Sequence, residues 1–140
     1  MTEIKHIGRD ELQTLLAGMD IDCAVDSKGT LYCVFPADDD FFHDVVFYFT
    51  PDDDGWFGIE AVADGFDLSE DEIGHALVFC NDFSRRARLP KAFIANGRLK
   101  LDQWTVFPEA TDDEYISQYI ELVLTMCWSF FVNAKQKLNN

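Results

Sequence analysis

Lys91-Ala-Phe-Ile-Ala-Asn-Gly-Arg-Leu-Lys-Leu101 is the stretch that most directly predicts local structure in this sequence. Asn96-Gly97 lies between two short apolar runs and is a preferred pair for a two-residue turn, whose central residues both need positive φ. Such a turn places Phe93 beside Lys100 on one face of the pair of strands. Residues 91–101 therefore predict an antiparallel hairpin.

Three apolar stretches upstream predict further strands. They cover residues 31–35, 45–49 and 57–62, and residues 21–25 predict an additional edge strand. The connections are short, which favours an antiparallel meander because parallel neighbours need long crossovers. The strands at 31–35 and 45–49 are apolar on both faces, so we expect both sides of the sheet to need cover.

Three helices complete the predicted order α-β-β-β-(β)-α-β-β-α. Leucines and methionines at helical spacing predict the first over residues 10–19. Ser69-Glu-Asp-Glu72 is a capping box that opens a second helix ending near residue 88. Thr111-Asp-Asp-Glu114 is another, opening a helix to residue 135 or beyond. The sequence therefore predicts one α+β domain over residues 1–140.

Composition indicates a self-sufficient fold. The 140 residues are 48% hydrophobic and include 13 Phe, which is enough for a single buried core. The four cysteines form no CxxC and lie in apolar stretches, which favours reduced core thiols over disulfides. The N-terminal residues lack the apolar region of a signal peptide, and no stretch reaches the roughly 20 apolar residues of a membrane span. We expect a soluble cytoplasmic protein with no membrane partner.

Charge is distributed unevenly along the chain, whose net charge is −15. Residues 1–84 contain 20 acidic and 3 basic residues, whereas residues 85–100 contain 6 basic residues and no acidic ones. An acidic surface repels phosphate backbones, so nucleic acid is not an expected partner. The basic strip at 85–100 is the exception, and Arg85, Arg86, Arg88 and Lys91 form a candidate anion site. The alternative is that these cations complement the dipole at the end of the second helix.

Apolar side chains outside the main stripes of the two long helices form a candidate binding surface. They are Val78 and Phe79 on the second helix and Leu124 and Trp128 on the third. A monomer would expose them as patches of a size that soluble proteins seldom keep. We expect a homodimer or a partner groove, formed by the second sheet face or by the helix flanks. The alternative is that the sheet wraps both sides of these helices.

Catalytic and metal-binding patterns are missing from the sequence. Two Asp runs, 38–40 and 52–54, fit solvated turns better than the spacing of a calcium loop. His6, His43 and His75 are isolated, and GxSxG, GxxxxGK[ST] and GxGxxG do not occur. We expect no catalytic residue, no metal and no cofactor.

Residues 80–101 resemble the signature stretch of the YbjN family, which comprises candidate sensory transduction regulators of bacteria. The similarity rests on Asn81, the basic run, the Lys-Ala-aromatic strand at 91–93, Gly97 and the apolar strand after it. Ser84 departs from it, because the family usually repeats Asn there, and no Gly follows the 98–107 strand. The resemblance implies the fold of type III secretion chaperones, dimerisation and protein binding. It implies no catalytic residue.

Three functions remain open on the sequence alone. The first is a non-catalytic protein-binding module, chaperone-like or regulatory. The second is an adaptor that binds an anionic ligand or acidic peptide through residues 85–100. The third is a small metal-dependent enzyme using His75 or the Asp runs. The excess of apolar surface and the missing catalytic patterns favour the first.

Overall fold

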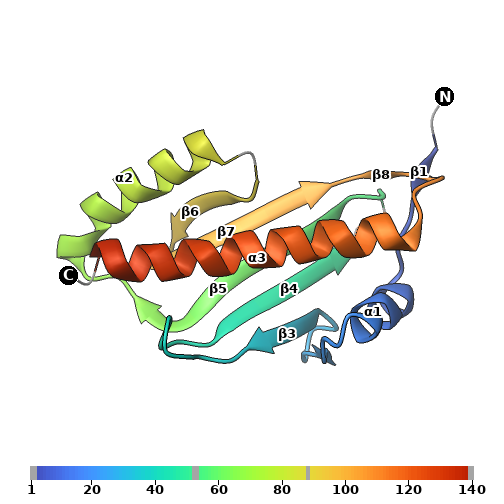
Figure 1. Ribbon diagram of the computed structural model, residues 1–140, viewed down its shortest axis with the longest axis horizontal. Helices are drawn as coiled ribbons and strands as arrows, with labels where there is room; N and C mark the ends of the chain where they lie inside the picture. Colours follow the sequence, from blue (N-terminus) through green and yellow to red (C-terminus); the bar gives the residue numbers. More distant parts are fainter. Residues whose placement is uncertain (1–2, 52–53, 88, 139–140) are drawn as a thin grey trace.

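The computed structural model of the protein describes residues 3–51, 54–87 and 89–138 and has an α+β fold (Figure 1). Three helices and an antiparallel sheet follow the predicted order, with two extra short strands near the N-terminus and before the last helix. In chain order the elements are β1 (Ile4–Lys5), α1 (Arg9–Gly18), β2 (Ala24–Val25), β3 (Leu31–Phe35), β4 (Val45–Pro51), β5 (Phe57–Asp67), α2 (Glu70–Arg86), β6 (Lys91–Ala95), β7 (Arg98–Thr105), β8 (Phe107–Pro108) and α3 (Asp113–Leu138).

The main sheet has six strands in the order β2-β3-β4-β5-β7-β6, and every neighbouring pair is antiparallel. The predicted combination of the meander with the 91–101 hairpin is confirmed. Asn96 and Gly97 have φ values of 55° and 74°, as their turn requires, and Phe93 pairs with Lys100. Because the turn is set by two residues, the sequence could predict it directly.

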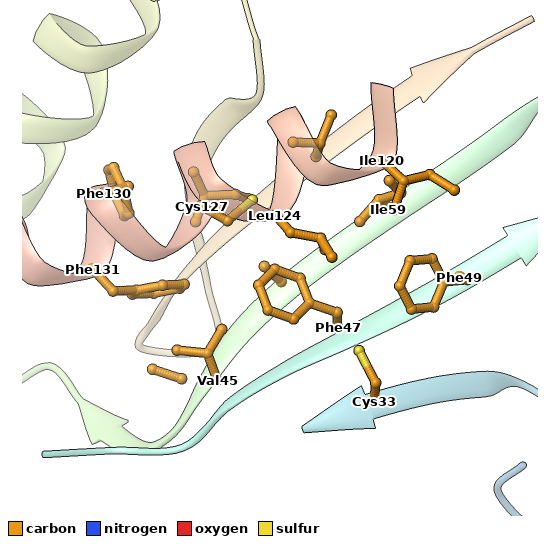
Figure 2. Packing of buried hydrophobic residues seen from close by; sticks show 14 of the residues in the cluster. Cys33, Val45, Phe47, Phe49, Ile59, Ile120, Leu124, Cys127, Phe130 and Phe131 are labelled. Carbon is orange, nitrogen blue, oxygen red and sulfur yellow. The ribbon is translucent and has the colours of Figure 1, made fainter. Parts of the chain in front are cut away.

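The core lies between the helices and one face of the sheet. α3 runs across this face, and Figure 2 shows its side chains meeting those of β3, β4 and β5. Alternate strand residues point toward it, as the period of two in a strand requires. The side chains in Figure 2 include Cys33, Val45, Phe47, Phe49 and Ile59 from the sheet and Ile120, Leu124, Cys127, Phe130 and Phe131 from α3.

By length and composition alone, α3 is apolar enough to cross a membrane. One such helix is weak evidence, because the core helix of a soluble protein meets the same criteria. Eight side chains of α3 are buried in the core. We therefore treat α3 as the core helix of this fold.

The opposite face of the sheet has no comparable cover. The register places Val34, Val46 and Val62 side by side, and Trp104 lies across Gly58, where an added Cβ would stand 2.7 Å from the indole ring. Every side chain on this face is half-buried or exposed, and Trp104 is 44% exposed. We call this surface the open sheet face; it consists of Tyr32, Val34, Val46, Tyr48, Thr50, Glu60, Val62, Lys91, Phe93, Arg98, Lys100, Asp102 and Trp104. The expected cover is thus present on one side only.

The starts of α2 and α3 depend on side-chain hydrogen bonds to the backbone. The backbone N–H of Ser69 donates to Oε1 of Glu72 at 2.9 Å, which confirms the first capping box and lowers the pKa of Glu72. For α3 the prediction of Thr111 as the cap is wrong. The backbone N–H of Tyr115 donates to Oδ1 of Asp112 at 2.8 Å, so the cap lies one residue later. Thr and Asp side chains can both accept this hydrogen bond, and the residue at which the first helical turn begins decides which of them does so.

α2 covers the edge of the sheet at β6. The backbone N–H of Ala92 donates to Oγ of Ser84 at 3.1 Å. Ala92 lies on the edge strand, where an unpaired N–H could otherwise form a hydrogen bond with a strand of another molecule. Ser84 therefore fills the role of an edge cap, which gives a structural purpose to the position where the sequence departs from the YbjN pattern.

Candidate functional site

An apolar groove runs beside α3. Two adjoining concavities of about 440 and 470 Å³ share Phe35, Leu124 and Thr125 in their lining. The groove lies between α3, the connection from α1 to β2, and the loop from β3 to β4. We call it the α3 groove; its apolar lining consists of Met19, Ile21, Phe35, Pro36, Ala37, Leu124 and Trp128.

Core residues hold the floor and wall of the α3 groove in place. Leu124 forms the floor and is only 3% exposed. The ring of Phe35 packs edge-on against Phe47, with centroids 4.9 Å apart. Trp128 stands edge-on against the fully buried Phe41 at 5.9 Å. The apolar surface of the groove is thus fixed by packing before any partner arrives.

The charged residues of the α3 groove are all acidic. Asp20 and Glu121 line one end and Asp38 lines the other, and no Lys or Arg contributes to the lining. Asp38 also shapes its loop, because its Oδ1 accepts the backbone N–H groups of Asp40 at 2.8 Å and Phe41 at 3.0 Å. The arrangement favours a ligand that is apolar and positively charged.

The four predicted surface residues do not form one patch. Leu124 and Trp128 line the α3 groove, whereas Val78 and Phe79 lie on α2 outside it. Val78 is 69% exposed, as expected, and Phe79 is half-buried against Phe130 at 5.1 Å. The expectation of an exposed Leu124 is wrong. α3 lies close along the sheet, so the side of the helix that bears Leu124 is covered too, which was the alternative reading of the sequence.

The predicted anion site is divided and its charges are partly neutralised. Arg85 and Arg86 end α2 and both contact the carboxylate of Asp82, at 2.9 and 2.8 Å. Lys91 lies on β6 opposite Asp102 of β7. Arg88 lies outside the described residues. The described cations therefore fit helix termination and strand pairing better than a converging anion site.

The other cations of the basic strip lie on β7 and are paired. Nε of Arg98 donates to Oδ1 of Asp67 at 2.8 Å, and Nζ of Lys100 stands 3.7 Å from Oε1 of Glu60. Both line a shallow concavity of about 710 Å³ over the open sheet face. Its charged lining is of mixed sign, with Asp26 and Glu60 beside Lys28, Arg98 and Lys100, in contrast to the entirely acidic lining of the α3 groove.

The residues considered for metal binding are scattered. Asp38 shapes a turn, as predicted for the first Asp run, whereas Asp52 and Asp53 of the second run lie outside the described residues. Nδ1 of His43 stands 3.1 Å from the carbonyl oxygen of Asp64. Within residues 3–51, 54–87 and 89–138, no three His, Cys, Asp or Glu side chains gather in a way that could hold an ion. The absence of catalysis and of a metal remains a prediction.

Sequence reasoning did not identify the other walls of the α3 groove. Met19 and Ile21 come from the α1–β2 connection, and Phe35 comes from the end of β3. The one available signal was the apolar character of residues 31–35 on both faces. That pattern indicated that both faces of this strand would be covered by other segments. It did not indicate which segments would pack against it.

Comparison with known proteins identifies the fold. No family model matches the sequence, and no curated protein matches it significantly. Among solved structures, it is similar to YbjN from E. coli, described as a candidate transcription regulator, with a TM-score of 0.68, 96% of each chain covered and 12% sequence identity. At that identity the similarity shows the fold alone. The chain therefore has a YbjN-like fold, as the resemblance at residues 80–101 implied.

Proposed function

We propose that the protein is a non-catalytic binding module of regulatory or chaperone-like type, and that the α3 groove takes an apolar, basic segment of another protein. The observation that carries this proposal is the combination of an apolar floor with an entirely acidic charged lining. A regulatory binding role is compatible with the YbjN-like fold. The proposal places the protein in the cytoplasm, where its thiols are normally reduced.

Apolar contact would supply most of the affinity. Burying one Leu-sized side chain contributes roughly 1.5–3 kcal/mol, and concavities of this size accept side chains or small ligands. The net charge of −15 adds attraction for a basic segment over longer distance, mainly by raising the association rate. Binding should consequently weaken as salt is added.

The edge of β3 favours an extended segment. β2 pairs only with Leu31 and Tyr32, so within the described strands the end of β3 beyond Cys33 has no paired strand on that edge. Phe35 belongs both to this edge and to the α3 groove. A partner segment could therefore add to β3 as a strand while placing alternate side chains in the groove.

Removal of the groove wall should weaken peptide binding. A fluorescein-labelled peptide of alternating Lys and Leu, titrated in an anisotropy assay, should bind at low salt. Trp128→Ala should raise its Kd at least about tenfold, or about 1.4 kcal/mol, because the wall is lost. Glu121→Lys, at an exposed position, should also raise the Kd without disturbing the core.

Trp104→Ala is the matched control, since this tryptophan lies on the open sheet face. It should leave the Kd unchanged. A peptide of alternating Glu and Leu should bind far more weakly than the basic one. Equal affinity for the two peptides, or equal loss in Trp104→Ala and Trp128→Ala, would show that the α3 groove is not the binding site.

We also propose that the open sheet face holds a second copy of the chain. Its central valines are apolar, and Arg98 and Lys100 are paired with Asp67 and Glu60, so two copies can approach there despite their high net charge. Sedimentation at micromolar concentration should give twice the mass of the chain. Val46→Lys, which puts a charge in the middle of the face, should give the monomer. A monomer for the unaltered protein would exclude a stable dimer.

A further inference from the structure

Two cysteines of neighbouring strands face each other at the edge of the sheet. β2 pairs with β3 through Ala24 opposite Tyr32 and Val25 opposite Leu31. Continuing this register by one residue places Cys23 opposite Cys33. The two thiols are also close enough to influence each other's ionisation. Both cysteines are free thiols in this structure.

The separation that this register implies suits a disulfide. Directly opposed residues of an antiparallel pair have Cα atoms about 4.5 or 5.5 Å apart, depending on the type of pair. Disulfides form across Cα distances of about 4.4–6.8 Å. Either type of pair therefore allows the disulfide to form with little backbone movement. The two-residue β2 lies at the edge of the sheet, where the backbone can make that small movement.

Solvent access and the pKa values of the two thiols assign them different roles. Cys23 is half-buried, whereas Cys33 is 2% exposed, so a reagent reaches Cys23 first. Burial, and then the adjacent thiol of Cys23, raise the pKa of Cys33 to about 12. Burial and then the charge of Asp22 raise the pKa of Cys23, while the adjacent thiol of Cys33 lowers it. Cys23 is thus the thiol that ionises and attacks first.

We propose that Cys23 and Cys33 form a reversible intramolecular disulfide under oxidising conditions, with oxidised glutathione as the oxidant. The Cys23 thiolate attacks one sulfur of the glutathione disulfide, forms a mixed disulfide and releases one glutathione thiolate. Cys33 gives up its proton and attacks the Cys23 sulfur, releasing the second glutathione. The two protein thiols lose two electrons and two protons in total, and one oxidised glutathione becomes two reduced ones.

The bond would fasten β2 to β3 beside the α3 groove. Ile21 lies two residues before Cys23, and Phe35 lies two residues after Cys33; both line the groove. Oxidation therefore fixes the distance between two of its walls. This consequence for binding rests on the proposed function, whereas formation of the disulfide does not.

Equilibration of the folded protein with glutathione buffers of increasing oxidation tests the proposal. After alkylation of the remaining thiols, peptide mass spectrometry should find Cys23 linked to Cys33, while Cys80 and Cys127 are alkylated only after denaturation. The oxidised protein should melt roughly 5 °C higher than the reduced protein, because the bond constrains the unfolded chain. Dithiothreitol should reverse both changes.

Two variants make the assignment specific. Cys80→Ala alters a buried thiol whose pKa burial raises to about 11, and it should leave disulfide formation unchanged. Cys23→Ala should abolish the disulfide and the rise in melting temperature. The proposal is overturned if no Cys23–Cys33 link forms in folded protein, if the stable product is Cys23 carrying glutathione, or if Cys33 pairs with another cysteine.

A third measurement separates this proposal from the proposed function. The basic peptide should bind the oxidised and reduced proteins with Kd values that differ by about threefold or more, corresponding to about 0.6 kcal/mol. If neither form binds the peptide, the binding proposal fails while a detected disulfide stands. If both bind with one Kd, the disulfide has no effect on the α3 groove, and that part of the inference is overturned.

Discussion

Phe41→Ala is expected to lower the free energy of unfolding by about 3–5 kcal/mol, the usual loss for a buried Phe. Phe41 comes from the loop between β3 and β4, yet its side chain is 0% exposed. Its ring lies 5.5 Å from that of Phe66, 5.7 Å from Phe131 and 5.9 Å from Trp128. Truncation would leave a cavity among these rings, and urea denaturation monitored by circular dichroism would measure the loss.

Phe42→Ala provides the matched control at the next position. Phe42 is 66% exposed, and Nζ of Lys135 lies 3.5 Å from the centre of its ring. An exposed cation–π contact contributes only about 0.5–1 kcal/mol, so this variant should lose no more than that. Similar losses in the two variants would contradict the view that Phe41, rather than Phe42, anchors this loop in the core.

The same substitution connects stability to the α3 groove. Trp128 stands against Phe41 on one side and lines the groove on the other. Phe41→Ala should therefore weaken peptide binding at temperatures where the protein is still folded. Phe42→Ala should leave peptide binding intact, which distinguishes loss of the wall from a general effect of the loop.

The strands and helices were predictable because their signals are local. Asn96-Gly97 specifies its turn through the φ values of two residues, and Ser69 with Glu72 specifies a helix start within one turn. The cap of α3 was displaced by one residue because Thr111 and Asp112 offer equivalent acceptors. Which of the two residues caps the helix depends on where the first helical turn begins. The sequence predicts that position less clearly than it predicts the helix itself.

The candidate site was only half predictable. The apolar character of Leu124 and Trp128 marked them as unusual, but their roles as floor and wall depend on segments distant in sequence. The burial of Phe41 was not predicted, because this residue follows a run of aspartates that predicts a solvated turn. Asp38 does form that turn. The burial of Phe41 depends on the packing of this loop against α3, where Phe41 meets Trp128 and Phe131. The placement of Cys23 opposite Cys33 likewise depends on the register of β2. The sequence of a two-residue strand is too short to predict that register.

Phe130→Ala is expected to cost about 3–5 kcal/mol as well, and to act on α2 before the rest of the fold. Phe130 is fully buried on α3, and its ring lies 5.1 Å from Phe79 and 4.9 Å from Phe83 of α2. Ala76 and Cys80 are the side chains of α2 that are fully buried. The helix therefore depends strongly on these aromatic contacts, with the bond between Ser84 and Ala92 as its other anchor.

Hydrogen exchange followed by mass spectrometry should reveal this order of events. Segments that bury little surface open locally at a lower free energy than the whole domain. In Phe130→Ala the amides of residues 70–86 should exchange faster by a larger factor than those of β4 and β5. Ser129→Ala, at the exposed neighbouring position, should change the free energy of unfolding by no more than about 0.5 kcal/mol. If β4 and β5 lose protection as much as α2 does, then α2 unfolds with the whole domain, and the aromatic contacts of Phe130 stabilise the core as one unit rather than holding one helix.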